Sequence, residues 1–311
     1  MRAKNRPPAP DHDLLLNSPC KINLMLEVVG RRPDGYHDLR SVFHALDLSD
    51  RLAFRALPDG PVELTSDHRD LLCDETNLVV RAGRLLKETA GLARGARIHL
   101  QKRIPMGGGL GGGSSNAAIT LLALNHLWEA GLGRESLYEL AARLGSDVAF
   151  FLEGGTALCT GRGENVEPLE GVPELHVVLV LPGLHVSTAA VYGRLNSSLT
   201  TCRGERNNVL EALREADFEL LGRSLHNDLQ EAAFDVDERL RTLWNGLQSC
   251  ADAGGAKGCL LSGSGSSFFM LTDDASTCRR CAALVERELD LPCVVASSYP
   301  AWHTQIEQLI A

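Results

Sequence analysis

The chain has 311 residues, 44% of them hydrophobic and 23% charged, a globular balance that excludes wholesale disorder. Its 31 Lys and Arg residues against 40 Asp and Glu residues give a formal net charge of −9. This acidic balance disfavours nucleic acids and anionic membranes as partners, although it leaves room for a local basic pocket that binds phosphates. The length corresponds to about two domains.

Cysteine usage and the N-terminus predict a reduced, cytoplasmic protein. Residues 1–12 are polar and rich in proline, which predicts a disordered tail, and no apolar segment resembles a signal peptide or a membrane span. The nine cysteines are scattered and odd in number, unlike a secreted disulfide framework. Cys278 and Cys281 form a CxxC pair with no partner pair or His cluster nearby, so we expect ordinary thiols on a helix surface or half-buried there, not a metal or redox site.

The hydrophobic pattern of the first half predicts alternating strands and helices. Period-two alternation over 20–28 predicts a half-buried strand that carries Lys21 and Asn23 on one face. Further elements follow in chain order: a turn over 30–35, short strands over 42–47 and 51–56, a helix over 77–89, a strand over 96–100, a helix from 117 to about 128 and a helix over 134–144. Asp147 then lies in a loop after Gly145.

The second half has a different pattern. It begins with a strand over 177–181, helical patterns over 187–195 and 208–253, and strands over 258–261 and 267–271 joined through 262–266; a helix over 275–289 and a strand over 293–297 follow. This order indicates an α+β protein and not a regular βαβ array. We expect a first domain over 13–172 and a second over 173–311.

The most unusual stretch runs from Pro105 to Asn116, where six of twelve residues are glycine. Glycines permit close backbone approach, and the helix that follows offers free N–H groups to an anion, so the stretch predicts a phosphate-binding loop. Ser114 and Ser115 at the helix start could cap it, contact phosphate or help to hold Mg²⁺. No Lys follows the glycines and no βαβ unit surrounds them, which excludes the Walker and Rossmann motifs.

The segment Pro105–Ala118 resembles the ATP loop of the GHMP kinases, which phosphorylate small alcohols. Five other segments agree with the resemblance, which covers about 18–300: Ser18–Leu24, Arg32–His37, Leu144–Asp147, Gly161–Glu164 and Ser262–Gly265. The resemblance implies an α+β fold of two domains, the first similar to domain 2 of ribosomal protein S5 and the second ferredoxin-like, with the active site between them. Cys20 and Ser146 depart from the family's usual alanines, and both are small.

The resemblance also implies roles for individual residues and a requirement for ATP with Mg²⁺. It assigns Lys21 and Asp147 to catalysis, Asp147 as the base. It places ATP at Asn77, Pro105, Met106, Gly107, Gly108, Gly109, Leu110, Gly111, Gly112, Gly113, Ser114 and Ser115, and the second substrate at Asn23, Tyr36, His37, Phe43, Thr188, Tyr192, Gly263, Ser264 and Gly265. A helix N-cap is an equal alternative for Asn77, and a tight hairpin is an alternative for 262–265. The Mg²⁺ ligands stay open, with Ser115 as a candidate.

The segment Asp34-Gly-Tyr-His37 is most similar to the subfamily whose substrate is a cytidine-diphosphate-linked methylerythritol. In that interpretation His37 pairs with the cytosine edge while Tyr36 and Tyr192 stack on the base. The alternatives are a homoserine or mevalonate type of GHMP kinase and a non-catalytic ATP-binding regulator. Both Lys21 and Asp147 are present, which disfavours the regulator because simple binding requires neither. We expect a monomer or a weak homodimer.

Overall fold

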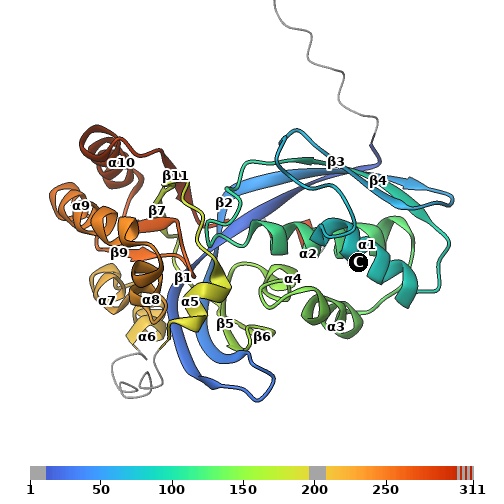
Figure 1. Ribbon diagram of the computed structural model, residues 1–311, viewed down its shortest axis with the longest axis horizontal. Helices are drawn as coiled ribbons and strands as arrows, with labels where there is room; N and C mark the ends of the chain where they lie inside the picture. Colours follow the sequence, from blue (N-terminus) through green and yellow to red (C-terminus); the bar gives the residue numbers. More distant parts are fainter. Residues whose placement is uncertain (1–11, 196–207, 300–301, 303–304, 307–308, 310–311) are drawn as a thin grey trace, which may run out of the picture.

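Two β-sheets, each covered by helices, form the molecule (Figure 1). The computed structural model describes residues 12–195, 208–299, 302, 305, 306 and 309, so the predicted N-terminal tail lies almost wholly outside the described residues. The seven-stranded sheet has the order β3-β4-β2-β1-β8, with β5 paired to β2 and β6 to β5. The four-stranded sheet has the order β11-β7-β10-β9. The predicted α+β class is confirmed.

The first half of the chain contributes most of the larger sheet and the helices that cover it. Its elements are β1 (Leu14–Arg31), β2 (His37–Leu57), β3 (Val62–Ser66), α1 (Leu78–Thr89), β4 (Gly95–Gln101), α2 (Gly112–Leu127), α3 (Arg134–Leu144), α4 (Phe150–Glu153), β5 (Thr156–Gly161) and β6 (Asn165–Pro168).

The second half contributes the smaller sheet, its helices and one short strand of the larger sheet. Its elements are β7 (His176–Val180), α5 (Thr188–Gly193), α6 (Asn208–Glu215), α7 (Phe218–Ser224), β8 (His226–Asn227), α8 (Gln230–Val236), α9 (Glu238–Gly254), β9 (Gly258–Leu261), β10 (Phe268–Thr272), α10 (Ala275–Leu289) and β11 (Cys293–Ser297). Strand β8 pairs in parallel with β1, so the larger sheet includes a strand that lies beyond the expected domain boundary at 172/173. The position of that boundary stays a prediction.

Strands β1 and β2 are long and antiparallel, and irregularities in their pairing set which side chains reach the site. The prediction of separate strands over 42–47 and 51–56 is wrong, because β2 continues through this region. Pro19 pairs with Ser49 while Cys20 pairs with Leu46, so two residues of β2 bulge out without ending the strand. A second irregularity lies between Asn23 and Met25.

Helix α2 runs through the interior of the first half, in contact with β1, β2 and the helices α1, α3 and α4 (Figure 1). From Ser115 to Leu124 all side chains except Ser115, Asn116 and Thr120 are apolar, and this run is buried without interruption. A helix that is apolar on all sides belongs in a core, which explains why α2 is covered by other helices. It begins at Gly112, within the glycine run, earlier than the predicted start at 117.

Several local predictions hold, and the strands that sequence reasoning missed are short. Helix α1 has Asn77 as its N-cap and α3 ends at Gly145. Strands β3, β5 and β6, of 5, 6 and 4 residues, were not predicted because so few residues do not establish a period. In the part of the chain that the structure describes, none of the helices has the length and apolar character needed to cross a bilayer.

Candidate active site

Three adjoining cavities lie where the two halves of the chain meet. The loop cavity, of about 320 Å³, is lined by the glycine run together with Leu71, Asn77, Leu78, Leu100, Lys102, Pro105, Met106, Ser114 and Asn116. The central cavity, of about 440 Å³, shares Gly107, Gly109 and Gly111 with it. The aromatic cavity, of about 760 Å³, shares Leu39, Asp147, Thr188 and Tyr192 with the central cavity. The three cavities therefore form one continuous site.

The glycine run needs glycine at defined places. Gly107, Gly109 and Gly111 have φ of 69°, 75° and 70°, the left-handed region that side chains disfavour. A Cβ on Gly109 would lie 2.1 Å from the backbone oxygen of Ser262, so the loop is packed against a second turn. Gly111 is the N-cap of α2, whose first turn therefore presents free N–H groups at the loop cavity.

A buried carboxylate holds both ends of the glycine run. Asp50 is 0% exposed and accepts hydrogen bonds from the backbone N–H groups of Arg103 (2.7 Å) and Ile104 (2.8 Å), just before the loop. It also accepts from Nδ2 of Asn116 (3.1 Å) beyond the loop, and it pairs with the Lys102 Nζ at 2.6 Å. Burial lowers the pKa of Lys102, an effect that Asp50 opposes. Because four donors satisfy it, Asp50 fixes the width of the loop.

The second turn, Ser262–Ser267, closes the other side of the glycine run. The Ser262 hydroxyl donates to the Gly109 carbonyl (3.1 Å) and the Ser267 N–H donates to the Gly108 carbonyl (3.2 Å). Asn227 fixes this turn in place, since its Nδ2 donates to the carbonyls of Leu261 (2.8 Å) and Gly263 (2.7 Å). The turn therefore connects β9 and β10 and also forms part of the wall of the central cavity.

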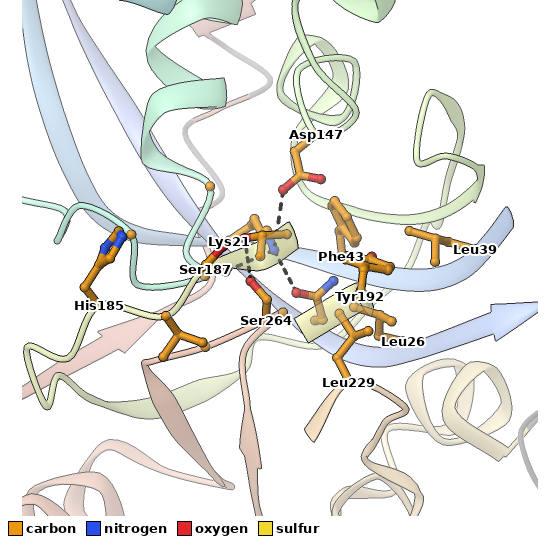
Figure 2. A pocket seen from close by; sticks show the side chains of 18 residues that line it. Lys21, Leu26, Leu39, Phe43, Asp147, His185, Ser187, Tyr192, Leu229 and Ser264 are labelled. Atoms are coloured by element: carbon orange, nitrogen blue, oxygen red, sulfur yellow. Dashed lines mark hydrogen bonds and ion pairs between the residues drawn. The ribbon is translucent and has the colours of Figure 1, made fainter. Parts of the chain in front are cut away.

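Lys21 and Asp147 face each other across the central cavity (Figure 2). The Nζ atom of Lys21 lies 3.6 Å from an Asp147 carboxylate oxygen, and it donates to Asn23 Oδ1 (2.7 Å) and to the Gly109 carbonyl (3.0 Å). It also lies 4.8 Å from the centre of the Phe43 ring. Lys21 is 3% exposed, whereas the Asp147 side chain is 32% exposed, so the carboxylate is accessible to a bound molecule.

The aromatic cavity carries rings and arginines. His37 stacks on Tyr192 with ring centroids 5.1 Å apart, and the guanidinium of Arg162 lies 4.9 Å above the Tyr36 ring. Burial and the nearby Arg31 lower the pKa of His37, which favours the neutral ring. Burial, with a smaller contribution from Asp147, raises the pKa of Tyr192. The cavity therefore offers flat neutral rings beside positive charge.

The structure brings nearly all the predicted site residues to these cavities. The glycine run, Pro105, Met106, Leu110, Ser114 and Asn77 line the loop cavity; Lys21, Asn23, Phe43, Asp147, Thr188, Tyr192, Gly263, Ser264 and Gly265 line the central cavity; Tyr36 and His37 line the aromatic cavity. Both alternatives for Asn77 hold in geometry, because its Oδ1 caps α1 by accepting from the Val79 N–H.

Ser115 lies elsewhere. It is 0% exposed, and its hydroxyl accepts from the Ser18 hydroxyl at 2.7 Å in the interior behind the loop. The helical turn of about 100° between neighbours directs Ser114 to the cavity and Ser115 to the core. The interpretation of Ser115 as a phosphate or Mg²⁺ contact is not favoured by this placement, and Ser114 is the better candidate.

Sequence reasoning missed several residues of the site. Lys102 lines the loop cavity, and Arg31 and Arg162 line the aromatic cavity. Position alone could have suggested two of them, since Lys102 directly precedes the loop and Arg162 lies within the Gly161–Glu164 segment. No local pattern points to Asp50 or Asn227, because their partners are distant in sequence.

The described residues contain no group of three or more His, Cys, Asp or Glu side chains arranged to hold a metal ion. Cys278 and Cys281 are both 0% exposed, more deeply buried than predicted, and burial raises the pKa of Cys278 to about 11. Such thiols are poor ligands and poor nucleophiles.

Family models match both halves of the chain. The model of the GHMP kinases N terminal domain matches residues 77–155, which include the glycine run and Asp147, and the model of the GHMP kinases C terminal domain matches residues 209–309. A 4-diphosphocytidyl-2-C-methyl-D-erythritol kinase of Exiguobacterium sibiricum is 40% identical over 267 residues, which cover 86% of this chain and 92% of the relative. The enzyme of the same name from Pelotomaculum thermopropionicum is 41% identical over 268 residues with the same coverage.

Comparison with solved structures leads to the same family. A crystal structure of a 4-(cytidine 5'-diphospho)-2C-methyl-D-erythritol kinase matches with a TM-score of 0.76 and 36% identity, and the match covers 91% of this chain and 98% of that one. A homoserine kinase from Cytophaga hutchinsonii also has a TM-score of 0.76, but at 22% identity it shows the fold alone. The predicted two-domain GHMP kinase fold is therefore confirmed. This chain belongs to the 4-diphosphocytidyl-2-C-methyl-D-erythritol kinases, ATP-dependent small-molecule kinases of the GHMP group.

Proposed function

We propose that this kinase transfers the γ-phosphate of ATP to the 2-hydroxyl of 4-diphosphocytidyl-2-C-methyl-D-erythritol, giving the 2-phosphate and ADP, in the non-mevalonate route to isoprenoid precursors. The Lys21–Asp147 pair, which lies in the central cavity between the loop cavity and the aromatic cavity, is the observation that supports this most. A phosphoryl donor in one cavity and a long acceptor in the other would place their reacting ends at this pair.

The chemistry assigned to the pair requires little covalent participation by the protein. The substrate hydroxyl oxygen bonds to the γ-phosphorus as the bond from that phosphorus to the bridging oxygen breaks, and ADP leaves. Asp147, as the base, accepts the hydroxyl proton. Lys21 is held by Asn23 and the Gly109 carbonyl, and it stabilises the charge on the phosphoryl oxygens.

The loop cavity is the proposed ATP site. The free N–H groups at the start of α2 and the close backbone approach at Gly107–Gly113 suit a triphosphate. Mg²⁺ bound to the phosphates supplies further charge neutralisation, and the Ser114 hydroxyl is the proposed protein contact near it. Asn77 and Leu78 also line this cavity and are our proposed contacts for the adenine.

The aromatic cavity is the proposed cytidine site. Tyr36, His37 and Tyr192 offer stacking surfaces and a polar edge for the base. Arg31 and Arg162 line the same cavity and supply positive charge for the diphosphate of the substrate. Since His37 lies against Tyr192, we propose that the base stacks beside this pair and that Arg162 exchanges its contact with Tyr36 for one with phosphate.

The eight cysteines that the structure describes are all free thiols, which supports a cytoplasmic, reducing location as part of this proposal. A monomer or weak homodimer remains our proposal for the assembly.

The test is an ADP-release assay with Mg·ATP and three acceptors: the cytidine-linked methylerythritol, homoserine and mevalonate. Turnover with the cytidine compound alone is the expected result. Turnover with another alcohol would keep the kinase mechanism but remove the roles of Tyr36 and His37. ATP binding without turnover of any acceptor would favour a regulator.

A further inference from the structure

Ser41 lies on β2 directly behind the central cavity, and it is 1% exposed. Its hydroxyl donates to the Met25 carbonyl at 2.5 Å and accepts from Nδ2 of Asn23 at 2.9 Å. Asn23, itself 1% exposed, accepts the Lys21 ammonium on its Oδ1 at 2.7 Å. A chain of hydrogen bonds thus leads from the Lys21 ammonium through Asn23 and Ser41 into the protein interior.

The donors in this chain of hydrogen bonds allow only one orientation of the Asn23 amide. A lysine ammonium has no acceptor, so Lys21 requires the amide oxygen. The hydroxyl of Ser41 has one proton, which the Met25 carbonyl takes, so toward Asn23 the hydroxyl can act only as an acceptor and requires the amide nitrogen. Both ends demand the same amide orientation, and Ser41 is the group that sets it from the protein side.

The strand irregularity at this point explains why the contacts meet. Asn23 pairs with Phe43 and Met25 with Val42, so β1 has one residue more than β2 here. Leu24 and Met25 then both face the same core cluster, and the Met25 carbonyl turns toward Ser41. Bulges of this kind often lie beside active sites, where they redirect side chains.

We propose that Ser41 is a positioning residue for phosphoryl transfer: it locks the Asn23 amide so that its oxygen holds Lys21 toward Asp147 and the transferred phosphoryl group. Without Ser41, only Lys21 itself holds the orientation of the amide. The Asn23 side chain can then rotate, and the Lys21 ammonium loses a fixed acceptor on the side away from Asp147. Ser41 lines none of the three cavities, so it acts through Asn23 and not on a substrate. This inference rests on the proposed function of Lys21.

The first test is Ser41→Ala in the full chain. We expect kcat with the cytidine substrate to fall about 10- to 100-fold, the loss expected when the hydrogen bond between Asn23 and the charged Lys21 is no longer held in place, while KM for both substrates stays within about threefold. Ser49→Ala is the matched control, because it also removes a buried hydroxyl from β2. The Ser49 hydroxyl donates to the Asp47 carbonyl and lines none of the three cavities, so kcat should not change. A Ser41→Ala enzyme with wild-type kcat would overturn the inference.

The second test separates positioning from packing. In an Asn23→Ala background, Ser41→Ala should cause no further fall in kcat, because the amide that links Ser41 to Lys21 is already absent. Full additivity of the two effects would overturn the inference. Ser41→Cys supplies the same test if the alanine variant does not fold, since sulfur keeps the shape but is a weak acceptor. Wild-type chain that does not turn over the cytidine substrate would instead contradict the proposed function itself.

Discussion

The two ends of the site are built differently. At the loop end, Asp50 is wholly buried and saturated with donors, and Gly109 packs against the Ser262 carbonyl with no room for a side chain. At the aromatic end, Tyr36 is 54% exposed and its ring contacts the Arg162 guanidinium. In the proposed function, the tightly packed end takes the triphosphate and the more exposed end takes the base and diphosphate of the second substrate. The comparison predicts that changes at the first end damage the fold and ATP use together, while changes at the second affect one substrate.

The largest effect is expected where the two ends meet. Asp147→Asn removes the proton acceptor but keeps the shape, so kcat should fall by about 10³-fold or more, within the range for loss of a general base and its charge. The measurement is steady-state ADP release, with ATP affinity measured on the same preparation and expected to stay near the wild-type value.

Asp59→Asn is the control for a carboxylate at an exposed position away from the cavities, and it should leave turnover unchanged. Retained turnover in Asp147→Asn would contradict the assignment of Asp147 as the base.

Asp50→Asn should be the most damaging change at the loop end. It leaves the Lys102 ammonium buried without its counter-charge, a loss that typically costs about 3–5 kcal/mol of unfolding free energy. We expect KM for ATP to rise while KM for the cytidine substrate changes little. Urea unfolding and the two KM values test this, and a loss of stability with no change in KM for ATP would show that Asp50 does not shape the loop.

Gly109→Ala and Gly183→Ala form a matched pair, since both glycines have left-handed φ, 75° and 68°. A Cβ on Gly109 meets the Ser262 oxygen at 2.1 Å, while nothing lies within 4 Å of one on Gly183. Gly183→Ala should therefore cost only the backbone term of about 1–2 kcal/mol. Gly109→Ala should cost more and should also raise KM for ATP. Equal thermal shifts in the two variants would contradict the tight packing of the loop.

Tyr36→Ala tests the aromatic end. Loss of one stacking ring should raise KM for the cytidine substrate by about 5- to 100-fold, because base stacking on an aromatic side chain contributes about 1–3 kcal/mol. Thermal stability and KM for ATP should stay close to wild type, since the ring is half exposed. Tyr36→Phe keeps the ring and should restore KM. A rise in KM for ATP of the same size would refute the division of the site.

The smallest effect is expected at a buried contact between the two sheets. His44 bonds Thr156 at 2.7 Å and Ser298 at 2.9 Å, and burial lowers its pKa to about 4 from 6.5. Between about pH 4 and pH 6.5 the unfolded chain binds a proton on this histidine that the folded chain does not. The free energy of unfolding should therefore rise with pH through this range, and the contribution of His44 should be constant above it.

His44→Gln should remove up to about 1.4 kcal/mol per pH unit from that slope. Urea unfolding at several pH values between 4 and 7 measures it, and the control is His126→Gln, a change at an exposed position near the end of α2. An unchanged slope in His44→Gln would show that this histidine is not the responsible group.

Patterns that lie within a few residues were predictable. The shared face of Lys21 and Asn23, the Asn77 cap and the end of α3 at Gly145 each follow from local spacing or capping. The presence of a helix next to the glycine run also follows from local sequence, while phosphate binding by this loop stays a prediction. These features depend on the chain's own period and not on what packs against it.

The remaining features depend on contacts between distant segments. Asp50 reaches residues 53 and 54 positions away, and the Ser41 hydroxyl meets Met25 only because a bulge turns the strand. No spacing rule points to either. The continuity of β2 through its bulge was missed for the same reason, since the pairing of β1 decides it.

The most direct test of the account is simultaneous binding of both substrates to Asp147→Asn, measured by calorimetric titration of the cytidine substrate into enzyme saturated with Mg·ATP and into enzyme alone. Because the loop cavity and the aromatic cavity are separate regions joined by the central cavity with Lys21 and Asp147, we predict one molecule of each bound per chain, with little change in cytidine affinity when ATP is present. Competition between the two ligands for one site would contradict the account.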